Sequence, residues 1–414
     1  MIYFSPVKVS LISLNINGMQ FLDAFLDSVR FELESFPDAE LILLDNGSSD
    51  NSVSFVMNEH PWVRLIKSPR NLGFAAGCHK AADESEAELL VFVNNDMELE
   101  PGFIEEILKP FMDGKNVGAV TGLILNDTGT QIDFAGGDAN LFGWGFQRHH
   151  GEPASIVDEI QTGESVSDRL EDRLEDRLEV YATSQFFGCG GALAIKREIW
   201  EKSGGFDPDY FAFFEDVDLG WRLNLMGLKT VMAPKARVKH RHHGTAVAMP
   251  DSLRTYLVER NAVYSVIKNY DDNNLARIFP WALAMTNERA LIDQSIELQD
   301  LFRGRWYEDI WGTEHSKEID IITEIKDMKH AGITKAKKII KRSQERSKHN
   351  VRLLAIEEVF SKMDSLMQKR SKIQSMRKIS DDEIIKLMGE PYRTVLGHHR
   401  EKELMEKFRK NVQL

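Results

Sequence analysis

The strongest constraint on the fold is a regular alternation of strand and helix patterns over residues 1–130. The runs "LILL" and "LLVFV" are continuously apolar, as strands buried on both faces of a sheet are. Between such runs, apolar side chains recur at helical spacing. One example is the set Phe21, Leu22, Phe25, Leu26 and Val29. The alternation indicates βαβ units, so we predict an α/β fold with a mostly parallel sheet flanked by helices.

Polar residues follow each of the first four predicted strands. These are the segments 15–18, 45–52 ("DNGSSDNS"), 69–77 ("PRNLGFAAG") and 94–96 ("NND"). Ligands of open parallel sheets bind outside the carboxyl ends of the strands. Asp45 could accept hydrogen bonds from a base or ribose, and Asp96 could hold a divalent cation. The sequence lacks both G-x-G-x-x-G after the first strand and a P-loop, so we expect a metal-bound nucleoside diphosphate rather than a dinucleotide.

The segment 204–223, "GGFDPDYFAFFEDVDLGWRL", places five carboxylates among aromatic residues. Buried carboxylates are costly unless they are paired. Asp216 and Asp218 head a predicted helix, and its dipole alone would stabilise them there. Alternatively, Glu215 and Asp216 beside an aromatic wall form a base site with a raised pKa. Both interpretations stay open on the residues alone.

A cluster of histidines follows in "VKHRHHGTA", which contains His240, His242 and His243. Neutral imidazole can complete a metal shell that is otherwise built from carboxylate and phosphate oxygens. Single histidines are more often structural, and the sequence leaves the two roles open.

Several stretches together resemble the family 2 glycosyltransferases, which are inverting enzymes with the GT-A nucleotide-diphospho-sugar transferase fold. The likeness is to the rhamnosyltransferase-like branch of bacterial polysaccharide biosynthesis. The stretches are "VSLISLNINGMQFL", "LILLDNGSSDNS", "RNLGFAAG", "LLVFVNNDMELEPGF", "GCGGALAIKREIWEKSGGFDPDYFAFFEDVDLGWRL" and "HRHHG", in the order of the family. The segment "ERNAVYSVIKNY" is similar to the one that follows the catalytic domain in that branch.

The resemblance implies a binding site for the nucleotide sugar. Asn15 and Asp45 would hold the nucleoside, with Asp45 on the base. Asn71 and Gly73 of "RNLGFAAG" would also contact the donor. Asn94 would do so too, although it stands where the family often has Asp. The expected donor is a dTDP-sugar or a UDP-sugar.

The resemblance also implies the metal and the base. Asp96 would bind Mn²⁺ or Mg²⁺ against the diphosphate, together with His240 or His243. Asp216 would be the catalytic base, with Glu215 beside it. The base would take the proton of an acceptor hydroxyl during one direct displacement, which inverts the anomeric configuration.

We expect a catalytic domain at residues 1–265 and a C-terminal α-helical region at 266–414. An insert at about residues 140–182 contains the repeat "DRLEDRLEDRLE". One interpretation of the repeat is a solvated helix or a low-complexity segment. The other is a helix that lies over the substrate site or a partner. Residues 326–378 hold about sixteen Lys and Arg against about five Asp and Glu. Such basic, amphipathic helices fit a dimer interface or a helical cap, or contact with an anionic membrane or a lipid-diphosphate acceptor.

We therefore predict a transferase that acts on a glycan or lipid-linked acceptor. The net charge of −13 argues against a protein that coats nucleic acid. Two cysteines and a first segment that lacks a signal-peptide pattern favour the cytoplasm, with peripheral membrane association open. A glycosidase would also need two carboxylates, but it leaves the polar strand ends unexplained. A nucleotidyltransferase usually has a basic loop where this chain has "NINGMQ". The remaining alternative is a non-catalytic scaffold that works through its helical tail.

Overall fold

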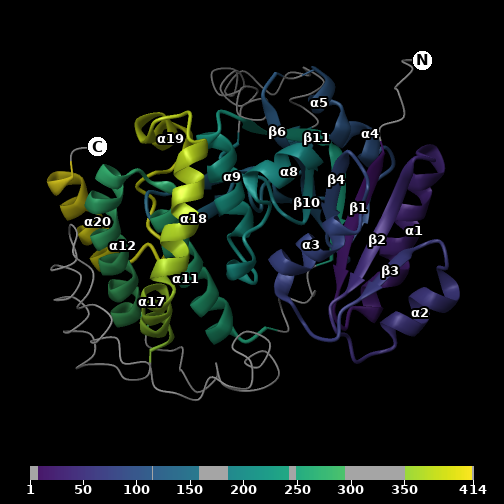
Figure 1. Ribbon diagram of the computed structural model, residues 1–414, viewed down its shortest axis with the longest axis horizontal. Helices are drawn as coiled ribbons and strands as arrows, with labels where there is room; N and C mark the ends of the chain where they lie inside the picture. The colour runs from purple at the N-terminus through teal and green to yellow at the C-terminus, as the bar shows by residue number, and fades with distance from the viewer. Residues whose placement is uncertain (1–7, 114, 158–184, 242–248, 294–349, 413–414) are drawn as a thin grey trace. The chain divides into compact units, whose positions relative to one another are not determined.

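The computed structural model describes residues 8–113, 115–157, 185–241, 249–293 and 350–412 (Figure 1). The chain divides into two compact units. The first contains 1–138, 146–209 and 227–248, and the second contains 139–145, 210–226 and 249–414. The division differs from the predicted split after residue 265, because 210–226 and the helix from 251 pack together in the second unit. Much of the predicted insert, including the "DRLE" repeat, lies outside the described residues.

The first unit is built on a nine-stranded sheet with the order β3-β2-β1-β4-β10-β6-β11-β5, and β7 pairs with β6. The short strands β8 and β9 pair separately. The strand bounds are β1 Val9–Asn15, β2 Ala39–Asp45, β3 Arg64–Lys67, β4 Leu89–Val93, β5 Met97–Leu99, β6 Val117–Asn126, β7 Ile132–Phe134, β8 Gly137–Ala139, β9 Gly145–Gln147, β10 Ala192–Lys196 and β11 Lys229–His240.

The first four strands form the predicted parallel half of the sheet. Their apolar runs are buried on both faces, since all five residues of β4 and the last five of β2 are buried. The second half is mixed, because β10 runs antiparallel to both of its neighbours while β6 and β11 are parallel. In the register, Asn15 lies opposite Asp45, and Asp45 lies opposite Lys67. The polar strand ends therefore share one edge of the sheet, as the sequence predicts.

Helices cover the sheet within the first unit. The predicted apolar face of α1 is confirmed, because its five residues are at most 8% exposed. The described helices of this unit are α1 Met19–Ser35, α2 Ser52–Glu59, α3 Gly73–Asp83, α4 Phe103–Leu108, α5 Pro110–Asp113 and α8 Arg197–Ser203. The 3₁₀ turn η1 (Pro208–Tyr210) follows. No described helix is both long enough and apolar enough to cross a bilayer.

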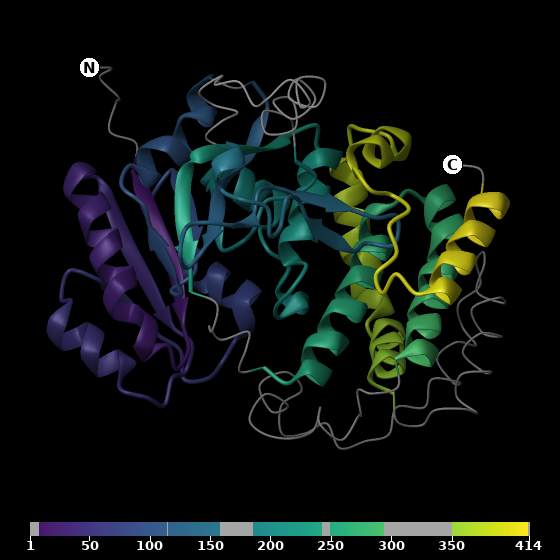
Figure 2. The same cartoon turned by 180° about the vertical axis from the view of Figure 1, so that it is seen from behind.

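The second unit is helical where it is described. Helices α11, α12, α17 and α18 lie side by side in both views (Figures 1 and 2). The bounds are α9 Glu215–Leu225, α11 Asp251–Asn269, α12 Asp272–Ile292, α17 Val351–Ser361, α18 Met363–Met376, α19 Asp381–Leu387 and α20 His399–Asn411. The predicted C-terminal amphipathic face is a core in α17 and α18, where Val359 and Leu366 are fully buried, whereas Met367 is exposed.

Charged side chains are buried between these helices. Glu259 of α11 accepts from Arg289 of α12 at 2.6 Å and from Arg352 of α17 at 3.0 Å. Arg289 also contacts Glu401 of α20 at 3.2 Å, and all four side chains are at most 6% exposed. Buried charges are tolerated when they are paired and hydrogen-bonded, and this cluster links the four helices through such pairs.

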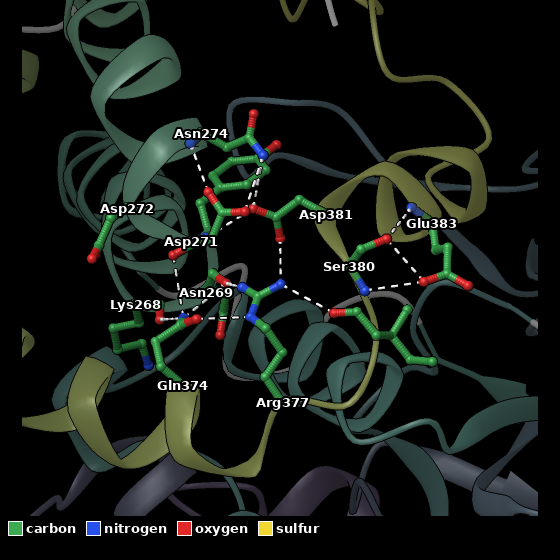
Figure 3. A network of polar contacts seen from close by, with 12 residues as sticks. Lys268, Asn269, Asp271, Asp272, Asn274, Gln374, Arg377, Ser380, Asp381 and Glu383 are labelled. Carbon is green, nitrogen blue, oxygen red and sulfur yellow. Dashed lines mark hydrogen bonds and ion pairs between the residues drawn. The ribbon is translucent and has the colours of Figure 1, made fainter.

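A second polar network closes the C-terminal end of α11 (Figure 3). The last carbonyls of a helix lack partners within the helix and attract cations. Here Gln374 Nε2 lies 3.1 Å from the carbonyl oxygens of both Lys268 and Asn269. Arg377 donates to the carbonyl of Asn269 and pairs with Asp381 at 2.7 Å. Some of the basic residues of the segment 326–378 are therefore internal caps rather than a free cationic surface.

Candidate functional site

The ends of β1 and β2 are joined by side chains. Asn15 Nδ2 lies 3.3 Å from Asp45 Oδ1, 3.1 Å from Ser48 Oγ and 2.9 Å from Ser52 Oγ. The second oxygen of Asp45 accepts from the backbone N–H of Ser48 at 3.2 Å. Asn15 and Asp45 are 2% and 4% exposed. These contacts hold the Asp45 carboxylate in a fixed orientation beside the loop that follows β2.

The end of β2 is tied to the loop after β3 by an asparagine pair. Asn46 Nδ2 donates to Asn71 Oδ1 at 2.9 Å, and Asn46 Oδ1 accepts from the backbone of Leu72 at 2.8 Å. Asn71 Oδ1 also accepts from the N–H of Gly73 at 2.8 Å. Gly73 has a φ of 79°, a conformation that favours glycine. The predicted donor residues Asn71 and Gly73 thus belong to one hydrogen-bonded loop.

The segment after β4 joins the same edge through Asn95. Its Nδ2 donates to Asn15 Oδ1 at 2.8 Å, and Asn95 is 6% exposed. The backbone N–H of the predicted residue Asn94 donates to Gly191 at 3.1 Å, and Asn94 is half-buried. We call Asn15, Asp45, Asn46, Asn71 and Asn95 the strand-end cluster.

Next to this segment, Asp96, His240 and Asp133 form a chain of contacts. His240 Nδ1 lies 2.6 Å from Asp133 Oδ2, and His240 Nε2 lies 3.5 Å from Asp96 Oδ2. Burial alone would lower the pKa of His240, but the carboxylates of Asp133 and Asp96 outweigh it and raise that pKa to about 9. With Nδ1 turned to Asp133, the other ring nitrogen faces Asp96, so Asp133 orients the imidazole.

Asp96 and His240 could form part of the ligand set of a divalent cation, provided that the imidazole gives up its proton when the ion binds. Asp96 Oδ1 is buried and has no hydrogen-bond partner within the described parts of the chain. A buried carboxylate oxygen of this kind requires a partner, and a cation is one. Among the described residues, no group of three His, Cys, Asp or Glu side chains could hold a metal ion by itself. Substrate oxygens would have to complete the shell, and His243 lies outside the described residues.

The predicted base residues belong to the second unit. Glu215 and Asp216 are the first two residues of α9, as the sequence predicts. Glu215 is 6% exposed, and its Oε2 has no hydrogen-bond partner among the residues the structure describes. Burial, followed by the charge of Asp216, holds the pKa of Glu215 well above its ordinary range. Asp216 is half-buried, and its Oδ1 accepts from the N–H of Val217 at 2.8 Å.

Asp218, two residues further on, has a structural role. It is fully buried and accepts from Arg222 at 2.9 Å, from Lys268 at 3.0 Å and from Asn269 at 2.9 Å. These partners lie one turn along α9 and on α11. Asp218 therefore fixes α9 to α11 through charged contacts, which the helix dipole alone does not explain.

Sequence reasoning missed three residues that the structure brings into contact with predicted ones. Asn46 and Asn95 lie next to predicted positions in "LLDNGS" and "VNND", so their polarity was a usable signal. Asp133 is 107 positions from His240, in a region without a recognisable pattern. Only the pairing of β7 with β6, and of β6 with β11, brings that carboxylate to the histidine.

Comparison with known proteins finds a glycosyltransferase family model and two relatives that match the first part of this chain. Residues 10–195 match the model "Glycosyl transferase family 2". An N-acetylglucosaminyl-diphospho-decaprenol L-rhamnosyltransferase of Mycobacterium tuberculosis is 28% identical over 244 residues, which cover 54% of this chain and 73% of that protein. O-antigen biosynthesis protein RfbC of Myxococcus xanthus is 27% identical over 249 residues, which cover 59% of this chain and 18% of that protein.

A solved structure supports the fold. The crystal structure of GalNAc-T7 with UDP, GalNAc and Mn²⁺ superposes with a TM-score of 0.50 at 15% identity. The match covers 68% of this chain and 52% of that one. The mixed sheet flanked by helices is thus the GT-A fold, which the sequence predicts.

Proposed function

We propose that this chain, which carries a family 2 glycosyltransferase domain in the GT-A fold, transfers a sugar from a nucleotide-diphosphate donor to an acceptor hydroxyl with inversion. The observation that supports this most is the strand-end cluster, where Asn15 contacts both Asp45 and Asn95 at one edge of the parallel strands. That edge is where ligands of open α/β sheets bind. The proposed donor is a dTDP-sugar or a UDP-sugar.

Asp216 is the proposed base. It would take the proton of the acceptor hydroxyl while that oxygen attacks the anomeric carbon on the face opposite the leaving diphosphate. One displacement inverts the configuration, and no carboxylate nucleophile is needed, unlike in a retaining glycosidase. Glu215 is buried with a raised pKa, so it stays neutral more readily than an exposed glutamate and adds less negative charge beside Asp216.

Asp96 and His240 are the proposed protein ligands of Mn²⁺ or Mg²⁺. When bound, the cation would offset the negative charge of the leaving nucleoside diphosphate. The buried oxygen Asp96 Oδ1 supports this role, and Asp133 would keep His240 oriented toward the ion. GalNAc-T7, which shares the fold, was crystallised with Mn²⁺. His243 stays an alternative ligand.

The acceptor is proposed to be a glycan or a lipid-linked saccharide. The names of the Mycobacterium and Myxococcus relatives refer to a diphospho-decaprenol saccharide and to O-antigen biosynthesis. An acceptor of that chemistry would place the enzyme at the cytoplasmic face of a membrane, in the synthesis of surface polysaccharide.

The test is release of nucleoside diphosphate. The purified protein is incubated with Mn²⁺ or Mg²⁺, a panel of nucleotide sugars and simple acceptors, and Asp216→Asn is the matched variant. Release from one donor, absent in Asp216→Asn, together with a product of opposite anomeric configuration by NMR, supports the proposal. Retention of configuration would exclude the single displacement. If no donor is either turned over or bound, the result would favour a scaffold that works through the helical region.

A further inference from the structure

Helix α11 carries a buried polar face that the proposed chemistry leaves unexplained. Its residues recur in pairs four positions apart, so they lie on one side of the helix. They are Arg260, Asn261, Tyr264, Ser265, Lys268 and Asn269, each at most 3% exposed, and we call them the α11 stripe. Buried polar groups are retained when they have partners, so the contacts of the stripe indicate its role.

The side-chain nitrogen of Asn261 donates to backbone carbonyls of one short turn, while its Oδ1 accepts from Arg260 Nε at 3.0 Å. Its Nδ2 lies 3.0 Å from the oxygen of Tyr210, 2.9 Å from that of Ala212 and 2.7 Å from that of Phe213. Arg260 Nη2 donates to the same Tyr210 oxygen at 3.0 Å. The amide of Asn261 is thus a donor shared by three carbonyls, within a residue that is fully buried.

The turn itself is strained. Phe211, Phe213 and Phe214 have φ values of 62°, 67° and 64°. Non-glycine residues rarely adopt this left-handed conformation, and for bulky side chains it is an outlier. Such residues persist where the surrounding structure over-determines them, and they concentrate at functional sites. The side chains of Asn261 and Arg260 donate to this backbone at the carbonyl oxygens of Tyr210, Ala212 and Phe213.

The strained turn leads directly into the proposed base. Phe214 is the N-cap of α9, and Glu215 and Asp216 follow it. On the far side of these two carboxylates, Asp218 is held by Lys268 and Asn269 of the same stripe. The α11 stripe therefore fixes the backbone just before the carboxylates and the side chain just after them.

We propose that Asn261 is a positioning residue, which holds the turn 210–214 and thereby sets the direction in which Asp216 presents its carboxylate. The inference rests on the proposed function only in treating Asp216 as the base. The inference also suggests a role for the C-terminal helices, which would stabilise the helix that carries Asn261. Gln374 of α18 and Arg377 after it cap the C-terminal end of α11 (Figure 3).

The first readout is amide hydrogen exchange in the whole 414-residue chain, which needs no substrate. In Asn261→Ala, we expect the amides of residues 211–217 to exchange about tenfold faster, because loss of a buried hydrogen bond changes an opening equilibrium by about that factor. The control is Asn350→Ala. Asn350 also donates to a backbone carbonyl, that of Ala290 at 3.0 Å, in the same unit. Unchanged exchange at 211–217 in Asn261→Ala would overturn the proposal.

The second readout separates positioning from folding. In Asn261→Ala, we expect kcat to fall about 10²-fold, as for a displaced catalytic group, while the KM for the donor stays unchanged. Asn350→Ala should keep its kcat per folded molecule. Asn261→Asp keeps the shape of the side chain but sets oxygens against carbonyls, so it should be at least as damaging as alanine. A milder effect of aspartate would mean that Asn261 only fills space.

The two proposals fail in different ways. If wild-type protein turns over no donor but residues 211–217 still lose protection in Asn261→Ala, the proposed function fails and the structural claim stands. If wild-type protein is active and Asn261→Ala retains full kcat, the positioning role fails alone. Should Asn261→Ala not fold, Asn261→Ser retains one donor, and an intermediate loss of kcat is expected; wild-type kcat in that variant would contradict the proposal.

Discussion

The strand-end cluster of the first unit and the base-bearing turn of the second unit obtain their order in opposite ways. In the cluster, asparagine and aspartate side chains contact one another at the ends of regular parallel strands, so the sheet itself positions them. In the turn, the backbone is left-handed at three phenylalanines, and a neighbouring helix holds it. Substitutions in the cluster should therefore act on binding, whereas substitutions around the turn should act on turnover or on folding.

The largest expected effect follows from removing the proposed base. Asp216→Asn keeps the size of the side chain and removes its capacity to accept a proton. General base catalysis typically contributes about 10²–10⁴-fold, so kcat should fall by that factor. Steady-state release of nucleoside diphosphate measures it. A loss smaller than about tenfold would assign the base elsewhere.

Breaking the anchor of the turn should affect stability strongly. Asp218→Asn leaves Arg222 and Lys268 buried without their counter-charge, which typically costs about 3–5 kcal/mol. Urea unfolding measures the change. The matched control is Asp251→Asn, since Asp251 forms an exposed pair with Arg254 at 3.7 Å and should change stability by less than about 1 kcal/mol. Equal effects in the two variants would refute the anchoring role of Asp218.

On the other side of the comparison, Asp133→Asn should weaken metal binding without touching the turn. Loss of the residue that orients a metal-binding histidine typically lowers affinity about 10–100-fold. Titration of Mn²⁺ by calorimetry or electron paramagnetic resonance measures the affinity. Asp138→Asn is the control, because Asp138 pairs with Arg148 instead of His240. If both variants bind Mn²⁺ like the wild type, His240 is not held for a metal by Asp133.

A smaller effect is expected from pH. Burial raises the pKa of Glu215, so above about pH 4.5 the folded protein keeps a proton that the unfolded chain releases. This contribution to stability is therefore present at low pH and is lost as pH rises toward the raised pKa. The slope is at most about 1.4 kcal/mol per pH unit, the value for one proton. Glu215→Gln should remove it, as unfolding midpoints measured across pH would show; an unchanged slope would contradict the assignment.

The two regions also differ in how much of their structure can be predicted from the sequence. The strands and the buried face of α1 follow from apolar runs and spacing, and the strand-end residues follow from parallel topology. The antiparallel direction of β10 cannot be predicted in this way, because an apolar run such as "ALAIK" does not indicate which strand it pairs with or in which direction. The contact between His240 and Asp133 depends on strand pairing across a long sequence separation.

The residues of α11 that hold the turn are visible in the sequence as a repeated polar pattern, which the count of basic residues does not reveal. The pairs "RN", "YS" and "KN" recur every four residues in "ERNAVYSVIKNY", a pattern of polar residues on one helix face. Within the basic segment, Arg352 and Arg370 are at most 5% exposed and contact other protein groups. A positive charge balance in sequence therefore does not distinguish a cationic surface from buried caps.

The most direct test compares donor affinity and turnover in the same preparations. Nucleotide-sugar affinity with Mn²⁺ is measured by calorimetry in wild type, Asp216→Asn and Asn261→Ala, beside kcat. We expect all three to bind the donor equally and the two variants to lose turnover, because binding depends on the strand-end cluster and chemistry on the turn. Affinity that falls in parallel with turnover in both variants would contradict this separation.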